Sequence, residues 1–241
     1  ERVRAELDEL EDGRWDEDTL AAEVERMRGK LVSSAASLSK KRQEAATRLE
    51  KEVEALLPDL GLPAATFKVQ LEALSEVRSH GAENVAFLVS VNAGFPPTAL
   101  ARVASGGELS RVMLALKAIL AQVDQVPTMV FDEIDAGIGG QVASLVATKL
   151  KDVARCHQVF VVTHLPQLAS RARSHILVEK SEGEGLAAAD VRGLTGDARV
   201  REIARMLGGD PESETSQDHA RELLAAGDEV REAIFNCYES L

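Results

Sequence analysis

The chain has 241 residues, of which 45% are hydrophobic and 3% aromatic, and its formal net charge at pH 7 is −12. This length and apolar content predict one large domain, or a domain with an appendage, with an aliphatic core. The acidic balance argues against a generally basic nucleic-acid-binding protein, although it is compatible with a local basic patch. Cys156 and Cys237 show neither disulfide nor metal spacing. Because we find no secretory segment and no apolar run of about 18 residues, we expect a cytoplasmic protein without a membrane-spanning part.

Residues 1–57 are dense in charge and predict a coiled-coil segment. Apolar residues recur at alternating spacings of four and three from Leu20 to Ala45, which is a heptad pattern weakened by Ser34 and Lys41. A helix over 18–57 would be about 60 Å long. We expect it to pair with an antiparallel helix in or before residues 1–12. The alternative is a long amphipathic helix that lies on the following domain.

The remaining residues, 58–241, are predicted to form a second domain. Two strands, 67–72 and 85–92, are joined by a connection at 80–84. After residue 105, helices and strands alternate, which predicts an α/β layered fold. In chain order these elements are a helix from 105, a strand at 127–132, a helix at 141–155, a strand at 158–163, a short helix after Pro166, strands at 175–180 and 187–194, and helices at 197–207 and 217–237.

A serine and two glycines, Ser105, Gly106 and Gly107, come directly before an apolar stripe at helical spacing that begins at Leu109. The start of a helix exposes free backbone N–H groups and the positive end of the helix dipole, and both favour a phosphate group. Glycines there allow another molecule to approach the backbone closely. The alternative is a glycine-rich turn that merely begins an ordinary helix.

Two acidic residues, Asp132 and Glu133, end the apolar run 128–131, which reads as a buried parallel strand. Open α/β sheets bind ligands at the carboxyl ends of their strands. One carboxylate there can hold Mg²⁺ beside nucleotide phosphates, and its neighbour can orient or deprotonate an attacking water. The alternative for this pair is a polar turn at a strand end.

A histidine, His164, ends the next apolar run, 159–163, which also reads as a buried strand. Taken alone, it is equally compatible with a capping or core histidine. The order of the three features is more specific than any one of them: a glycine pair, then a strand with two acids, then a strand with a histidine.

That order resembles the ATPase heads of the ABC superfamily. Ser105-Gly106-Gly107-Glu108 is similar to the signature motif, Val130-Phe131-Asp132-Glu133 to Walker B, Ile134-Asp135 to the D-loop, and Thr163-His164 to the switch-histidine strand. Transporter ATPases usually carry glutamine where Glu108 stands, whereas heads of the SMC and RecN type often carry glutamate. The stretches 104–111, 131–140 and 162–167 resemble the RecN type, a bacterial SMC-like DNA-repair family, and the resemblance runs from about residue 38 to the end.

The resemblance implies an ABC-type head from which an antiparallel coiled coil protrudes, with ATP held between two heads. It implies that Ser105, Gly106, Gly107 and Glu108 contact the ATP of a partner head, that Asp132 supports Mg²⁺, that Glu133 is the catalytic base, that His164 senses the γ-phosphate, and that Asp135 couples the two sites. It also implies a role in DNA double-strand break repair and recombination, with double-stranded DNA ends as partner. The expected location is the bacterial cytoplasm, on the nucleoid.

One motif of such heads is missing. A P-loop has the form G-x-x-x-x-G-K-[ST], but the only Gly-Lys pair, at Gly29 and Lys30, lacks the upstream glycine and is followed by Leu31. We therefore expect these residues to be the C-terminal part of a longer protein whose N-terminal segment carries Walker A. We expect the isolated chain to be inactive.

Two other readings stay open. One is a transporter-type ATPase subunit, and the other is a non-catalytic structural or dimerisation module. Basic residues on two predicted helices can contact DNA phosphates or simply face solvent; they are Lys40, Lys41, Arg42, Arg48 and Lys51 on the first, and Arg199, Arg201 and Arg205 on the second.

Overall fold

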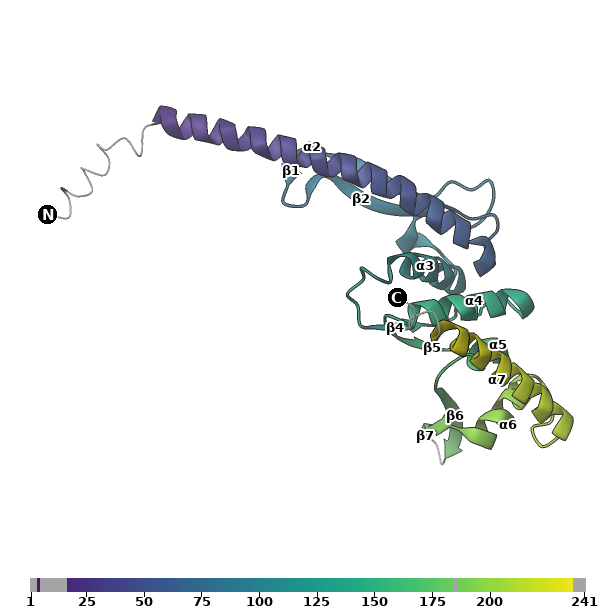
Figure 1. Ribbon diagram of the computed structural model, residues 1–241. Helices are drawn as coiled ribbons and strands as arrows, with labels where there is room; N and C mark the ends of the chain where they lie inside the picture. Colours follow the sequence, from purple (N-terminus) through teal and green to yellow (C-terminus); the bar gives the residue numbers. More distant parts are fainter. Residues whose placement is uncertain (1–3, 5–16, 184–185, 236–241) are drawn as a thin grey trace. The chain divides into compact units, whose positions relative to one another are not determined.

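The structure, a computed structural model, describes residue 4, residues 17–183 and residues 186–235 (Figure 1). The chain forms two compact units, which we describe separately. The first comprises Glu1–Lys51 and Phe67–Leu88, and the second comprises Glu52–Thr66 and Val89–Leu241. The two strands that follow the long helix thus group with it, whereas the predicted division fell after residue 57. That division stays a prediction about how the domains are organised.

The first unit is built on the long helix α2 (Glu17–Leu56), which matches the helix predicted over 18–57. Its heptad seam lies open in the part of the chain that the structure describes, because Leu20, Val24, Met27 and Leu31 are between 42% and 52% exposed. The predicted partner segment, 1–12, lies outside the described residues except for Arg4. The antiparallel pairing of this helix therefore stays a prediction.

A hairpin of two strands, β1 (Thr66–Arg78) and β2 (Gly81–Ser90), completes the first unit. The predicted connection at 80–84 is wrong, because the turn is confined to 79–80 and β2 already begins at Gly81. Gly81 has a φ of 114°, and a β-carbon there would lie 2.8 Å from the Arg42 guanidinium. Arg42 also donates to Glu83 at 3.3 Å, so α2 holds the end of the hairpin.

The second unit contains a parallel pair of strands, β4 (Thr128–Phe131) and β5 (Gln158–Val161), with Met129 opposite Val159. Between them in sequence runs α4 (Gly140–Val153), which packs against α3 (Gly106–Leu120). The two helices lie side by side near the strands (Figure 1). Because the strands are parallel, their carboxyl ends lie at the same edge, and this brings the residues after each strand together.

Only one face of this strand pair is covered. Met129 and Phe131 are buried, whereas Val130, Phe160 and Val162 on the other face are 67%, 44% and 59% exposed. The prediction of fully buried strands is therefore wrong for one face within the described chain. Parallel strands are ordinarily covered on both faces, so this face is of the kind that packs against further protein.

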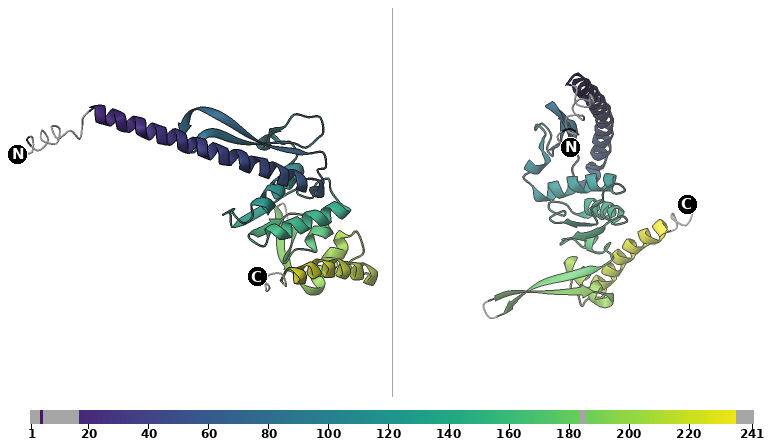
Figure 2. Two further views of the ribbon diagram at one scale, coloured as in Figure 1. Left: turned by 45° about the horizontal axis from the view of Figure 1, so that its top comes forward. Right: turned by 90° about the vertical axis from the view of Figure 1, so that its left-hand side faces the viewer.

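Three short elements were not predicted: η1 (Pro58–Leu60), β3 (Thr98–Ala99) and η2 (Leu100–Arg102). The other elements follow the predicted order: α5 (Pro166–Ala169), β6 (His175–Gly183), β7 (Leu186–Leu194), α6 (Gly196–Met206) and α7 (Glu214–Phe235). The strands β6 and β7 form an antiparallel hairpin that projects as a ribbon (Figure 2). A small core of Ala169, Ile203, Ala204 and Ala220 joins α5, α6 and α7. None of the described helices has the length and apolarity needed to cross a membrane.

Candidate functional site

The glycine pair begins helix α3, as predicted. Ser105 is the N-cap: its backbone is extended, and its Oγ accepts a hydrogen bond from the Glu108 N–H at 3.4 Å. The Leu109 N–H donates to the Ser105 carbonyl at 3.0 Å, which closes the first turn. Serine is a favoured residue at this position because its oxygen satisfies one of the free N–H groups of the helix start. Gly106 is exposed, whereas Gly107 is buried.

Both glycines lie against the acidic segment of the same chain. A β-carbon at Gly107 would lie 2.8 Å from the Glu133 carbonyl oxygen and 2.8 Å from the Ala136 β-carbon. A β-carbon at Gly106 would overlap with Oε2 of Glu133. The absence of side chains at these positions therefore serves packing inside the chain, a reason that sequence analysis did not reveal.

Asp132 and Glu133 follow β4 and are both exposed. The Ser110 hydroxyl donates to the Asp132 carbonyl at 2.8 Å, so α3 fixes the backbone at this point. The Glu133 N–H donates to Asp132 Oδ1 at 2.8 Å. Glu133 has a φ of 55°, the only positive φ of a non-glycine residue among those described. Left-handed backbone of this kind is costly for a side-chain-bearing residue and occurs often at functional sites.

Asp135 and His164 are brought into direct contact, although they follow different strands. The Asp135 carboxylate is buried, and its Oδ2 accepts hydrogen bonds from Thr163 Oγ1 at 2.6 Å and from the His164 N–H at 2.9 Å. Nδ1 of the His164 ring lies 2.9 Å from the same oxygen, while the His164 side chain is 76% exposed. The ring is thus anchored on one nitrogen and open to solvent on its other side.

Arg111 is a residue of this site to which sequence analysis gave no role. Its Nη1 donates to the carbonyl of Ala136 at 2.8 Å and to that of Ile134 at 3.4 Å, and only 5% of the residue is exposed. Burial lowers the pKa of Arg111 from its usual value, and the nearby Glu108 carboxylate opposes this shift. The sequence feature that could have identified Arg111 is its position one helical turn after Gly107, on the buried face of α3.

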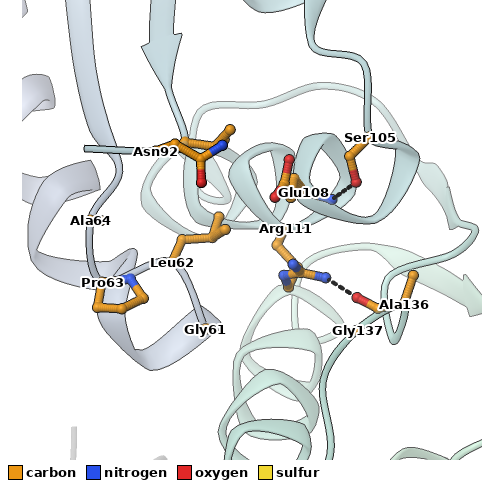
Figure 3. Close-up of a pocket in the computed structure, with 11 residues that line it drawn as sticks. Gly61, Leu62, Pro63, Ala64, Asn92, Ser105, Glu108, Arg111, Ala136 and Gly137 are labelled. Carbon is orange, nitrogen blue, oxygen red and sulfur yellow. Dashed lines mark hydrogen bonds between the residues drawn. The ribbon is translucent and has the colours of Figure 1, made fainter. Parts of the chain in front are cut away.

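Arg111 and Glu108 also line an open cavity of about 520 Å³ (Figure 3). Its other walls come from Ser105, from the loop 61–64, from Val91 and Asn92, and from the turn 136–137. Among the described residues, Asp132, Glu133 and His164 do not line it. Glu108 therefore shares this cavity with Ser105, the first residue of the same predicted signature motif, and not with the two acids and the histidine.

The chemistry of the acidic pair suits a nucleotide-bound magnesium ion better than a resident metal. In the described chain, no group of three or more His, Cys, Asp or Glu residues can hold a metal by itself. Mg²⁺ is commonly bound by one or two carboxylates together with water and substrate phosphates. The exposed Asp132 carboxylate fits such a partial ligand set.

The class of protein follows from the fold and from one solved structure. The chain resembles the Smc head domain with a coiled coil and joint from Pyrococcus yayanosii, with a TM-score of 0.51 and 18% identity, over 85% of this chain and 38% of that one. No protein-family model matches the chain. The chain therefore has the α/β fold of an SMC-type head, as the sequence motifs predicted.

Sequence comparison gives the particular family. The chain is 41% identical over 232 residues to the DNA repair protein RecN of Treponema pallidum, covering 94% of this chain and 40% of the relative. It is 44% identical over 220 residues to RecN of Deinococcus radiodurans, covering 91% and 38%. The chain belongs to the RecN family, and it spans about two fifths of the length of these curated relatives.

Proposed function

We propose that this chain is part of an ATP-binding and ATP-hydrolysing SMC-like head that acts in DNA double-strand break repair and recombination. One observation carries the proposal. The start of α3 at Gly106, the Asp132-Glu133 pair and the Asp135–His164 contact all lie at one edge of the second unit. These segments resemble the motifs of an ABC-type head, and their proximity in the fold supports the proposal.

Each side chain has a position that suits its proposed role. Asp132 supports Mg²⁺, because its carboxylate is exposed at the strand end. Glu133, exposed beside it, orients or deprotonates the attacking water. His164 turns the ring nitrogen that does not contact Asp135 toward the γ-phosphate and its attacking water. Bound ATP·Mg²⁺ supplies the phosphoryl group that these residues act upon.

Two copies of the head are needed in this proposal. Ser105 and Gly106 contact the γ-phosphate of ATP held by a second head, since the start of α3 offers backbone N–H groups and a positive dipole. Asp135, in the turn that follows β4, couples the ATP site of its own head to the ATP site of the partner head. ATP then favours the paired state, because its phosphates interact with groups from both heads, and hydrolysis removes that preference.

Walker A is assigned to a segment outside this chain. The exposed apolar face of Val130, Phe160 and Val162 supports this assignment, because parallel sheets are covered on both faces in folded domains. The relatives, which are more than twice as long as the matched region, provide room for such a segment. We propose that an N-terminal segment carrying Walker A packs on this face and completes the head.

DNA contacts are assigned to α2 rather than to α6. Arg199 of α6 donates to main-chain carbonyls within 169–172, Arg205 pairs with Glu202 at 2.7 Å, and Arg201 lies 3.6 Å from Glu212, so all three side chains already have partners in the chain. On α2, by contrast, Lys40, Lys41, Arg48 and Lys51 are exposed. These cations are the ones that can neutralise DNA phosphates. The relatives are bacterial DNA repair proteins, and the proposed location is accordingly the bacterial cytoplasm, on the nucleoid.

The proposal is tested with Glu133→Gln in the full-length protein. We expect ATP turnover to fall by about 100-fold or more, because the water loses its base, while ATP-dependent pairing of heads persists. Glu222→Gln, on the exposed side of α7, is the matched control and should turn over ATP like the wild type.

Turnover by Glu133→Gln at the wild-type rate would refute the assignment. A wild-type protein that pairs but never hydrolyses ATP would instead favour a non-catalytic dimerisation module. Hydrolysis that DNA leaves unchanged would favour the transporter-type reading.

A further inference from the structure

The Asp135 carboxylate collects three contacts on a single oxygen. Thr163 Oγ1 and the His164 N–H donate to Oδ2, and His164 Nδ1 lies 2.9 Å from it. A carboxylate is costly to bury unless donors surround it, and Asp135 is only 4% exposed. All of these partners come from the segment after β5, so this carboxylate is committed within its own chain.

We propose that Asp135 is a positioning residue that fixes the tautomer and orientation of the His164 ring. A neutral imidazole carries one proton, and the hydrogen bond made by one ring nitrogen decides which nitrogen holds it. With Oδ2 as acceptor, the proton stays on Nδ1, and Nε2 alone faces outward. The inference rests on the proposed function, in which that outward nitrogen, a hydrogen-bond acceptor in this tautomer, receives a hydrogen bond from the water at the γ-phosphate.

The backbone that carries Asp135 is itself held on both sides. Arg111 donates to the carbonyls of Ile134 and Ala136, which flank Asp135 in sequence. Arg111 belongs to α3, the helix that begins at Gly106. The orientation of the His164 ring is therefore set by a chain of contacts that starts on the glycine helix and passes through Arg111 and Asp135.

The test reads the tautomer directly by ¹⁵N NMR of the full-length protein labelled at histidine nitrogens, with the His164 signals assigned by their loss in His164→Gln. In the wild type with a neutral ring, we expect Nδ1 to be protonated and Nε2 to be unprotonated. We expect Asp135→Ala to move the proton largely to Nε2. Asp152→Asn, which removes an exposed carboxylate charge beside Arg155, is the control and should leave these signals unchanged. A wild-type spectrum with the proton on Nε2 overturns the proposal, and this measurement needs no substitution at Asp135.

ATP turnover supplies the second readout. We expect Asp135→Ala to lower kcat by about 10-fold or more while the KM for ATP changes little. Asp135→Asn keeps an acceptor oxygen, so it should retain the tautomer and lose less activity. Equal losses in both variants, with the tautomer retained in the asparagine variant, overturn a positioning role. If the wild-type protein hydrolyses no ATP, the proposed function fails, but the NMR result still decides what Asp135 does.

Discussion

The carboxylate of Glu133 lies directly against Gly106, so that a β-carbon at position 106 would overlap with Glu133 Oε2. The two residues are separated by a whole helix and a strand in the sequence. They meet because the segment after β4 returns to the start of α3, where the Ser110 hydroxyl donates to the Asp132 carbonyl at 2.8 Å. In the described structure, the proposed catalytic base therefore rests on the helix start that is proposed to receive the phosphate of a partner head.

The packing around the two glycines predicts that alanine at Gly107 lowers the free energy of unfolding more than alanine at Gly106 does. Gly106→Ala should change the free energy of unfolding by less than about 1 kcal/mol, because only the mobile end of the Glu133 side chain has to move and alanine favours the helix. Gly107→Ala should destabilise by about 1–3 kcal/mol, because its β-carbon meets the Glu133 backbone carbonyl and Ala136. Urea unfolding of both variants measures the difference. Equal destabilisation of the two would contradict the described packing.

Two substitutions of Ser105 can separate its role as the N-cap of α3 from its proposed role in the pairing of heads. We expect Ser105→Arg to block ATP-dependent pairing of heads in the full-length protein while single-head ATP binding remains, because the bulky cation would occupy the space in front of α3. The substitution also removes the hydroxyl that accepts the hydrogen bond from the Glu108 N–H. Ser105→Ala is therefore the control: it loses only the cap, at a cost of about 1 kcal/mol in stability, and should still pair. Gel filtration with and without ATP reads the outcome, and pairing by the arginine variant would speak against the assigned interface.

His175 predicts a pH dependence of stability. Burial lowers the pKa of His175 from its usual 6.5; the nearby Arg199 charge adds to this shift, and Glu202 opposes it. Its Nδ1 is also buried without a hydrogen-bond partner among the described residues. Below pH 6.5 the unfolded chain binds more protons at this site than the folded one, so the stability present above that pH is lost as the pH falls.

The measurement is the midpoint of thermal unfolding from pH 7.5 down to about pH 5, a window chosen around the ordinary histidine pKa. We expect His175→Gln to flatten the decrease, whereas His219→Gln, at an exposed position on α7, should follow the wild type. If the unfolding midpoint of His175→Gln decreases with falling pH as steeply as that of the wild type, then other groups cause the acid sensitivity.

Local patterns predicted much of this molecule. The helix over 18–57 and the alternation after residue 105 follow from hydrophobic periodicity, which is a property of neighbouring residues. The residues that end β4 and β5 could be placed at one edge because parallel strands leave no other arrangement. The connection at 80–84 was misplaced because Gly81 begins a strand against Arg42, a contact made with a residue far away in the sequence.

The sequence by itself determined the order of the elements, the helix start at Gly106, and the acids and histidine that stand at strand ends. The tertiary structure alone decided which of their side chains have partners: Arg111 holds the backbone around Asp135, and Asp135 holds His164. It also decided that one face of the β4–β5 pair lies open in the described chain. The physical reason is that burial and hydrogen-bond partners depend on groups that are distant in sequence. Helix and strand patterns, by contrast, are set by the periodicity of residues a few positions apart.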